Sequence, residues 1–490
     1  MDHPLLSRPA LAMLTLAGLV ALPYALPRRL VPERLRLLSP LPTSSAAPSP
    51  QAPAPQVGEV ALQETREDDG TSVEPSAPGG GALPFQRAAE PAAPALVDGP
   101  PPRSIEDPTG HALDPYYAAL ARVEAKEPGA VARMTYYGDS VIASDWITAT
   151  LRRKLQARFG DAGHGFILVA DAWPGYHHDN IRRSASKGWK VSRVVGPYAP
   201  DGLYGLGGVS FVADGPGMFA EVRTMDKGPI GQHVSRITVT YAVQPGGGKL
   251  ALKLDDQPAE ELSTAAPETR VVRKRLTMPD GPHKLEVRSN GGGPVRVFHL
   301  LLDRDEPGAV VDAVGIIGCR LRFLDKIDDA HWAEELKLRD PALIAFTYGA
   351  NESGDGFAFP MDQYEATARA VLKQARDALP NSACLIVGPL DAADKKGDAY
   401  PSRPVVPAMN AIQKKLAAEL GCGFFDTWQA MGGYGSMGIW LKKGLGGADL
   451  VHPSSMGAEV LGTWVYKALM EGYARYRAAP PPAASSAPGR

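Results

Sequence analysis

Three short segments of this 490-residue chain contain residue types that together could perform nucleophilic catalysis. Residues 138–140 (GDS) end an apolar stretch, which would place the serine at a helix start, where backbone N–H groups can stabilise an oxyanion. Residues 349–352 (GANE) follow another apolar stretch and supply an asparagine amide, a neutral oxyanion donor. In residues 449–452 (DLVH), the histidine could take a proton from the serine while the aspartate fixes its tautomer.

Each segment alone has a plainer explanation. Aspartate and serine commonly open helices, an asparagine after a strand is often a turn residue, and a histidine before Pro453 could lie on the surface. Their order along the chain favours one site. We therefore predict Ser140 as nucleophile, Asn351 as oxyanion donor, Asp449 as the orienting acid and His452 as the base.

The composition excludes several classes of protein. Lys and Arg total 52 against 54 Asp and Glu, so no global positive field would hold the chain on nucleic acid. Apolar residues make up 44% and charged residues 22%, which is ordinary for globular proteins and argues against wholesale disorder, a polytopic membrane protein or a coiled coil. Three cysteines (Cys319, Cys384 and Cys422) cannot form a disulfide framework, and we expect buried, unreactive thiols.

The N-terminal segment gives information about the cellular compartment in which the protein works. Residues 10–26 form an apolar run that is shorter than the roughly 20 residues that span a bilayer, and Pro23 interrupts it. The run has the length of a signal-peptide core, but it lacks a good cleavage site, and the arginines after it would be cytoplasmic by the positive-inside rule. We predict a signal peptide or membrane anchor over residues 1–38 and a periplasmic or extracellular location, with cleavage left open.

Both flanks of the folded part are rich in Pro, Ala, Ser and Gly. Residues 39–104 and 478–490 bury too little apolar surface to offset the entropy of ordering, so we predict a disordered linker and a disordered tail. The folded part then runs from residue 105 to 477.

The hydrophobic pattern of the folded part changes twice. A strand over 131–137 precedes a helical pattern over 142–159, and residues 215–307 then alternate with a period of two between glycine-rich turns. Strands alternate with helices again over 308–477. This pattern predicts an α/β fold, a doubly wound parallel sheet in two parts (105–214 and 308–477) interrupted by an antiparallel β-sandwich (215–307). The expected strands are 236–243, 249–255, 269–278, 283–289, 294–303, 310–317, 342–348, 383–387 and 423–426, and the later helices are 363–379, 406–420 and 455–475.

The ordered set of polar segments resembles the SGNH/GDSL-type hydrolases, serine esterases with a flavodoxin-like sheet. The resemblance implies the roles given above for Ser140, Asn351, Asp449 and His452. It also implies a glycine that donates a backbone N–H after the second strand of the sheet. The best match is Gly318, and the competing glycines are Gly205, Gly207 and Gly315.

The β-rich insert before that glycine is similar to one in bacterial periplasmic relatives of peptidoglycan O-acetylesterases, where the insert looks like a carbohydrate-binding module. Two positions depart from the pattern: Val141 stands where many relatives have histidine, and Glu352 where many have aspartate. The resemblance implies removal of O-acetyl groups from a cell-envelope glycan through an acetyl-enzyme, without cofactor or metal. The alternatives are an O-acetyltransferase with the same residues and a non-catalytic glycan-binding protein.

Aromatic and polar residues before the insert are candidates for substrate contact. We predict this role for Asp139, Trp173 and Tyr204; the alternative for the aromatic residues is that they pack the insert onto the sheet. Residues 177–179 (HHD) could suggest a metal, but a structural loop is favoured because no further ligands follow at suitable spacing. The remaining candidates are Tyr176, His177, His178, Asp179 and Trp189.

Overall fold

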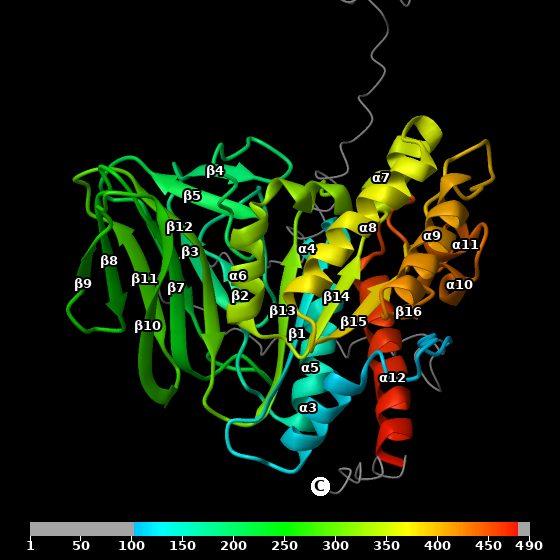
Figure 1. Ribbon diagram of the computed structural model, residues 1–490, viewed down its shortest axis with the longest axis horizontal. Coiled ribbons are helices and arrows are strands. Elements are labelled where there is room, and N and C mark those ends of the chain that lie inside the picture. Colours follow the sequence, from blue (N-terminus) through cyan, green and yellow to red (C-terminus); the bar gives the residue numbers. More distant parts are fainter. Residues whose placement is uncertain (1–101, 479–490) are drawn as a thin grey trace, which may run out of the picture. The chain divides into compact units, whose positions relative to one another are not determined.

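The computed structural model describes residues 102–478 (Figure 1). The predicted anchor, the linker up to residue 101 and the tail from residue 479 lie outside the described residues. Within residues 102–478, no helix combines the length and the apolarity that crossing a bilayer requires.

A five-stranded parallel sheet forms one core, with strand order β13-β1-β14-β15-β16. Counted along the chain, this is the order 2-1-3-4-5 of the flavodoxin-like doubly wound fold, and the predicted fold class is confirmed. The strands are short and buried on both faces, as parallel strands covered by helices must be. Their bounds are β1 Val131–Gly138, β13 Gly308–Gly315, β14 Leu343–Thr347, β15 Ala383–Val387 and β16 Gly423–Phe425.

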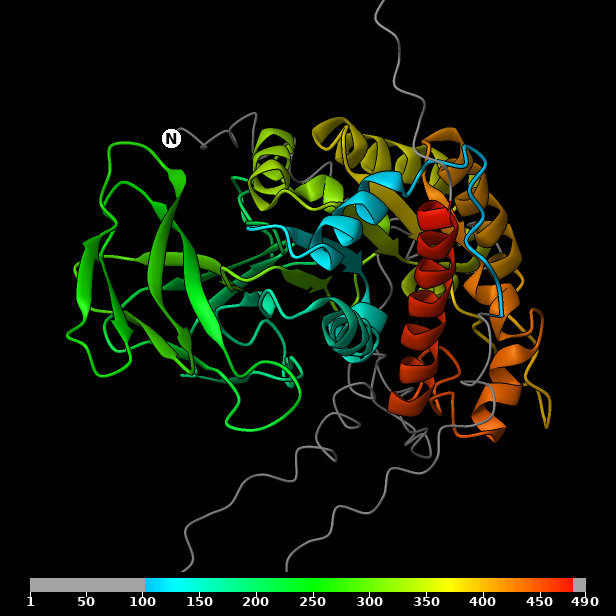
Figure 2. The ribbon, with the colours of Figure 1, turned by 90° about the horizontal axis from the view of Figure 1, so that it is seen from below.

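Helices cover both faces of this sheet (Figures 1 and 2). On one face α3, α5 and α12 pack against Ala132, Met134 and Tyr136 of β1, while Tyr137 of the same strand belongs to the core formed with α6, α8 and α9. The alternation follows from the period of two of a strand. The bounds are α3 Asp114–Glu124, α5 Trp146–Phe159, α6 Asp329–Arg339, α8 Met361–Ala378, α9 Val405–Glu419, α10 Thr427–Met431, α11 Ser436–Lys442 and α12 Ser455–Ala478.

The helix predicted over 142–159 is two helices. The short α4 (Ser140–Ala143) ends before Asp145, which has a left-handed backbone with φ of 59°, and α5 begins at the next residue. The carboxylate of Asp145 compensates for this strain, because it accepts two hydrogen bonds from the buried Arg152 guanidinium at 3.0 and 3.1 Å and one from the N–H of Asp179 at 2.9 Å. Apolar periodicity does not register such a break.

The remaining strands form two antiparallel sheets, and no strand of either pairs with the parallel sheet. One sheet has the order β10-β7-β12-β5-β4 with β2 also on β12, and the other has the order β3-β6-β11-β8-β9. The predicted start of this region at residue 215 is wrong, because β2 to β5 precede it. β2 and β5 are almost wholly buried, so they show no apolar–polar alternation. The bounds are β2 Gly165–Leu168, β3 Arg182–Ala185, β4 Lys190–Arg193, β5 Val209–Ala213, β6 Phe219–Arg223, β7 Val234–Val243, β8 Lys249–Leu254, β9 Glu260–Ser263, β10 Arg270–Gly281, β11 Lys284–Ser289 and β12 Val295–Asp303.

The antiparallel region begins after the end of α5 and rejoins the parallel sheet at the start of β13, and these two points are neighbours. The N–H of Ala309 donates to the carbonyl of Gly160 at 2.9 Å, so the chain returns to the point where it departed. A buried ion-pair network strengthens this junction: Arg339 of α6 binds Asp303 at the end of β12 and Asp312 of β13 at 2.7 to 3.1 Å. Each ion is compensated by the others, which buried charges require.

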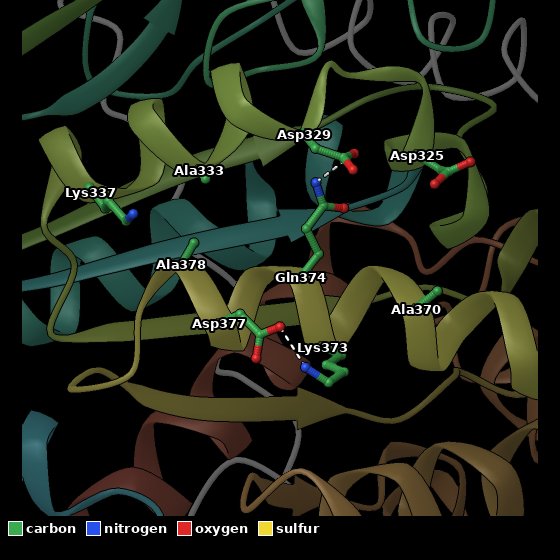
Figure 3. A pocket seen from close by; sticks show the side chains of 9 residues that line it. All are labelled: Asp325, Asp329, Ala333, Lys337, Ala370, Lys373, Gln374, Asp377 and Ala378. Atoms are coloured by element: carbon green, nitrogen blue, oxygen red, sulfur yellow. Dashed lines mark hydrogen bonds and ion pairs between the residues drawn. The ribbon is translucent and has the colours of Figure 1, made fainter.

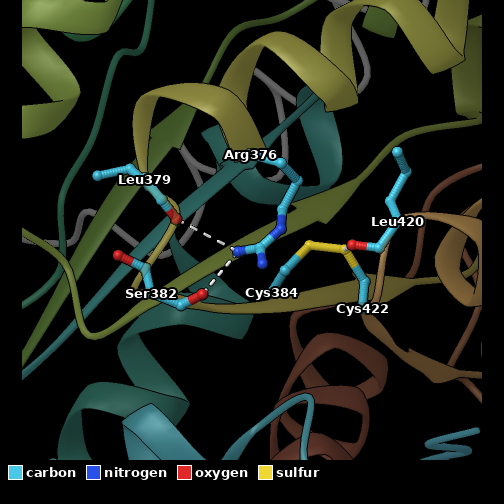
Figure 4. The surroundings of a disulfide bond; sticks show 6 residues. All are labelled: Arg376, Leu379, Ser382, Cys384, Leu420 and Cys422. Atoms are coloured by element: carbon cyan, nitrogen blue, oxygen red, sulfur yellow. Dashed lines mark hydrogen bonds between the residues drawn. A yellow bond between two sulfur atoms is a disulfide. The ribbon is translucent and has the colours of Figure 1, made fainter. Parts of the chain in front are cut away.

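The expectation of three free thiols is wrong for two of them. Cys384 and Cys422 form a disulfide (Figure 4). Cys319 is free and buried. Because β15 pairs with β16 so that Leu385 lies opposite Gly423, the preceding residues of the two strands are also neighbours, 4.6 Å apart at Cα. The spacing of three cysteines in the sequence carries no information about this register.

We expect the disulfide to stabilise the chain by about 3 kcal/mol, because it closes a long loop in the unfolded state. Denaturant unfolding of the Cys384→Ser/Cys422→Ser variant should give a free energy of unfolding lower by about that amount. In the denatured, unreduced wild type, a thiol reagent should label Cys319 alone. Labelling of all three cysteines under these conditions would contradict the pairing.

Candidate active site

The three polar segments meet at the carboxyl edge of the parallel sheet. Gly138 at the end of β1 lies between Gly315 of β13 and Thr347 of β14. The loops that follow these three strands therefore start side by side, at the edge where doubly wound folds place their functional residues.

Ser140, His452 and Asp449 form a hydrogen-bonded chain. The Oγ of Ser140 lies 2.6 Å from Nε2 of His452, and Nδ1 of the same ring lies 2.5 Å from Oδ2 of Asp449. With Nδ1–H donating to the carboxylate, Nε2 is left as an acceptor for the serine hydroxyl. Ser140 and His452 are both buried, at 2% and 6% exposure. The arrangement can deprotonate a serine as it attacks an electrophilic carbon.

The backbone around His452 is held by its own acid. Oδ1 of Asp449 accepts the N–H groups of Val451 and His452, each at 3.0 Å, which forms an Asx-type turn, and Leu450 inside the turn has a left-handed φ of 62°. The carbonyl of Leu450 accepts the N–H of Ala393, which ties the turn to the loop after β15. The histidine is thus fixed in position before any substrate binds.

The charge of Asp449 is stabilised within the folded chain. Burial opposes its ionisation, but the hydrogen bond and charge of His452 and the two backbone N–H groups outweigh burial and lower the pKa of Asp449 below its usual value. A lowered pKa means that these bonds stabilise the fold at neutral pH, and that their contribution is lost as the pH falls through the folded-state pKa.

Asp139 has a different role from the predicted contact with substrate. It is 1% exposed; Oδ1 accepts the N–H of Val141 at 3.0 Å and Oδ2 accepts that of Ala350 at 3.1 Å. Burial raises the pKa of Asp139, while these backbone bonds and the charge of His452 oppose that shift. The side chain connects the segment that carries Ser140 to the segment that carries Asn351.

Asn351 lies in α7 (Ala350–Asp355), the helix that follows β14. Its Nδ2 donates to the carbonyl of Cys319 at 2.9 Å. An amide nitrogen carries two hydrogens, so one remains for a developing oxyanion. The bond to Cys319 also brings Asn351 beside the loop that contains Gly318.

Gly318 fits the role of backbone donor by its conformation. Its φ is 78°, a value that favours glycine, and a Cβ there would meet no atom within 4 Å. The N–H of the next residue, Cys319, closes a turn onto the carbonyl of Ile316 at 3.1 Å. Gly318 remains the predicted donor.

The three competing glycines have other roles in the fold. The N–H of Gly205 donates to Nε2 of His331 at 2.9 Å, and a Cβ on Gly207 would overlap the ring of Phe166 in β2. Gly315 lies within β13, where a Cβ would come within 2.2 Å of the N of Ala143. These three positions are explained by packing.

The predicted substrate contacts of Trp173 and Tyr204 are wrong, and the packing alternative holds. Trp173 is 5% exposed and meets Tyr176 edge to face at 5.2 Å, and Tyr204, at 1% exposure, accepts the N–H of Ala199 through its hydroxyl at 2.7 Å. Tyr176 and Trp189 are likewise buried and hydrogen-bonded to backbone groups. Neither predicted contact offers a ring face to a sugar.

Residues 177–179 form a structural loop. The N–H of Asp179 binds Asp145, and His178 is buried 3.3 Å from Nε2 of His164. Burial lowers the pKa of His178 to about 3, although Asp145 opposes this shift, so the ring is neutral. Within residues 102–478, no group of three or more His, Cys, Asp or Glu side chains is arranged to hold a metal ion.

Sequence reasoning missed Asp391, which supports the site from the loop after β15. Its carboxylate accepts the N–H of Met437 at 2.8 Å, the hydroxyl of Ser436 at 3.2 Å and the indole N–H of Trp428 at 3.2 Å. It thereby anchors α10 and α11, which precede the turn at His452. The sequence signal that could have indicated Asp391 is an acidic residue four positions after the end of a predicted strand.

A surface hollow of about 490 Å³ lies apart from this site, between α6 and α8 (Figure 3). Gln374 donates to Asp329 at 3.0 Å and Lys373 to Asp377 at 2.6 Å within it, so these side chains satisfy one another. None of the three residues of the hydrogen-bonded chain lines the hollow.

Comparison with known proteins gives one family and several structures. Residues 280–460 match the GDSL-like Lipase/Acylhydrolase family, a range that includes Gly318, Asn351, Asp449 and His452. A peptidoglycan O-acetylesterase structure is similar with a TM-score of 0.64 and 23% identity, over 76% of this chain and 99% of that chain. This likeness shows the same fold.

Two further structures are less similar. A family two carbohydrate esterase from Cellvibrio japonicus has a TM-score of 0.25 and 14% identity, over 64% of this chain and 98% of that chain. An acetylxylan esterase from Geobacillus stearothermophilus has a TM-score of 0.25 and 21% identity, over 34% of this chain and 73% of that chain. No curated protein sequence matches the chain.

The hydrogen-bonded chain predicts an activated serine. A fluorophosphonate should attach to Ser140 and add one label per molecule by intact mass spectrometry, because Nε2 of His452 removes the hydroxyl proton. We expect Ser140→Ala to abolish labelling and His452→Ala to slow it by about 100-fold or more. Ser144→Ala, four residues away, is the matched control and should label normally; equal labelling of Ser140→Ala would contradict the assignment.

The contact between Asp449 and His452 should also matter for labelling. Asp449→Asn should lower the labelling rate at neutral pH by about 100-fold or more, because the amide no longer holds Nδ1–H of His452 in the tautomer that leaves Nε2 as the acceptor. A labelling rate equal to that of the wild type would argue against this contact.

Proposed function

We propose that the chain is an ester hydrolase that removes O-acetyl groups from a cell-envelope glycan, and the match of residues 280–460 to the GDSL-like Lipase/Acylhydrolase family supports the esterase activity. The observation that carries this proposal is the hydrogen-bonded chain from Ser140 through His452 to Asp449. All three members are chemically competent, which argues against a purely glycan-binding protein.

In the proposed first step, Oγ of Ser140 attacks the acetyl carbonyl while Nε2 of His452 takes its proton. The carbonyl oxygen becomes an oxyanion, which the N–H groups of Ser140 and Gly318 and the second Nδ2 hydrogen of Asn351 would stabilise. The imidazolium then protonates the glycan oxygen as its bond to the acetyl carbon breaks. The deacetylated glycan leaves and an acetyl-enzyme remains.

In the second step, water replaces the glycan. His452 removes a proton from the water, whose oxygen attacks the acetyl carbon, and the same donors receive the new oxyanion. The serine oxygen leaves with the proton from His452, which releases acetate and restores the starting state.

A likeness in fold supports the proposal that the substrate is a glycan. The structure with the highest TM-score described above is that of a peptidoglycan O-acetylesterase, and the likeness covers 99% of that chain. An antiparallel region lies between β1 and β13, the two strands that precede Ser140 and Gly318. Surface supplied by this region next to the site would suit a polymeric substrate.

We also propose that the protein works outside the cytoplasm. The Cys384–Cys422 disulfide supports this location, because disulfides persist mainly in oxidising compartments. The apolar run over residues 10–26 supports it as well.

The test is hydrolysis of p-nitrophenyl acetate and release of acetate from O-acetylated peptidoglycan by the full chain. Ser140→Ala should lose both activities, and the Ser140→Ala/His452→Ala double variant should be no slower than either single variant, because the residues act as a unit. Asn351→Ala should lower kcat by about 100-fold, the contribution of one oxyanion donor.

The outcomes separate the parts of the proposal. Near wild-type hydrolysis by Ser140→Ala would overturn the mechanism. Hydrolysis of the small ester without any release from peptidoglycan would leave an esterase and overturn this substrate. De-O-acetylated peptidoglycan is the control for background acetate.

A further inference from the structure

The residues that form the predicted oxyanion site sit on a loop whose shape depends on a neighbouring helix. We call residues 316–321 the oxyanion loop; it connects β13 to the 3-10 helix η3 (Leu321–Lys326). The loop contains one internal backbone bond, the turn from Cys319 N–H to Ile316 carbonyl. With a glycine at its centre, this single turn would not fix the direction of the Gly318 N–H.

Three side chains of α7 bind consecutive parts of this loop. Asn351 donates to the carbonyl of Cys319 at 2.9 Å, and the carboxylate of Asp355 accepts from Nε of Arg320 at 2.7 Å. Oε1 of Glu352, which lies between these two residues in α7, accepts the N–H of Leu321 at 2.8 Å. All three bonds join α7 to the stretch of chain that directly follows Gly318.

The contact made by Glu352 is the most buried of the three. Its side chain is buried, and it binds the first N–H of η3, which has no capping side chain of its own. The second oxygen, Oε2, is buried without a hydrogen-bond partner among the described residues. Burial, and next the charge of Asp139, raise the pKa of Glu352 to about 7, while the Leu321 N–H and Arg320 oppose that shift.

Burying a carboxyl that has one unpaired oxygen costs free energy. A role for its position would explain why the side chain is a glutamate. Burial and the charge of Asp139 destabilise its ionised form more than the Leu321 N–H and Arg320 stabilise it. An apolar residue would fill the same space without that cost, but it would leave the Leu321 N–H without an acceptor.

We propose that Glu352 is a positioning residue that fixes the oxyanion loop, and with it the Gly318 N–H, through its reach to the Leu321 N–H. This inference rests on the proposed esterase function. It assigns the function of Glu352 to the length and acceptor oxygen of its side chain, and not to its charge.

Three substitutions separate the length, the charge and the acceptor oxygen of this side chain. Glu352→Gln keeps the reach and an Oε1 acceptor and removes the charge, so kcat for p-nitrophenyl acetate should stay within about threefold of wild type. Glu352→Asp keeps the charge but is one methylene shorter, and Glu352→Ala has no acceptor. Both should lower kcat by about 10- to 100-fold with little change in KM, the effect of a displaced catalytic group.

The matched control is Glu335→Ala. Glu335 is also a buried glutamate, on α6, where it binds Arg273 of β10, away from the catalytic segments. It should lower the melting temperature and leave kcat per active site unchanged. Active sites are counted by fluorophosphonate titration of Ser140, so that loss of folded protein does not pass for loss of turnover.

Each outcome decides the question. Wild-type kcat in Glu352→Ala, or loss in Glu352→Gln with wild-type kcat in Glu352→Asp, would overturn the proposal. If Glu352→Ala does not fold, Asp355→Ala, whose contact with Arg320 is partly exposed, replaces it: a severalfold loss of kcat supports positioning by α7 and an unchanged kcat contradicts it. An inactive wild type would instead refute the proposed function.

Discussion

The buried carboxylate of Asp139 joins the two segments after β1 and β14 from which the site is built. Its two oxygens bind the N–H of Val141, beside the nucleophile, and the N–H of Ala350, beside Asn351. Loss of either bond would leave a buried donor unsatisfied, at about 1 to 3 kcal/mol. The pairing of β1 with β14 fixes where the two following segments begin, but it does not fix the conformation of the residues in them. Through its two hydrogen bonds, the carboxylate of Asp139 fixes the distance between Ser140 and the amide of Asn351.

Other acidic side chains around the site also accept hydrogen bonds from backbone N–H groups. Glu352 accepts the N–H of Leu321, Asp391 that of Met437, and Asp449 those of Val451 and His452. Each acid binds main-chain N–H groups, either in a turn or in the first turn of a helix, and so fixes a segment beside the site. Such a site is preorganised by fixed dipoles and charges, which lowers the reorganisation needed when an oxyanion forms. Of these acids, Asp449 alone also touches a reacting side chain, through Nδ1 of His452.

The alternation of strands and helices over 308–477, the three later helices and the triad could be predicted because each depends on local periodicity or on a short motif at a strand end. The shorter or less periodic helices α3, α6, α7, α10 and α11 were not predicted. The remaining errors share a physical origin. Short or fully buried strands such as β2 and β5 have no alternation to detect, and the break at Asp145 depends on Arg152, seven residues away. The Cys384–Cys422 pairing depends on strand register. Tyr204 has the side chain of a sugar-binding residue, and burial alone decides that it packs.

The junction between Gly160 and Ala309 has a consequence for how the chain can vary. Residues 161–307 leave the parallel sheet and return to it one hydrogen bond away, so the antiparallel strands form a closed excursion between neighbouring points. For a loop with fixed ends, the entropy of closure grows only with the logarithm of its length. The excursion could therefore be lengthened, shortened or replaced over evolutionary time while the ends of β1 and β13, and the catalytic edge between them, keep their spacing. If this region contacts the glycan as proposed, substrate preference could change while the catalytic edge stays the same.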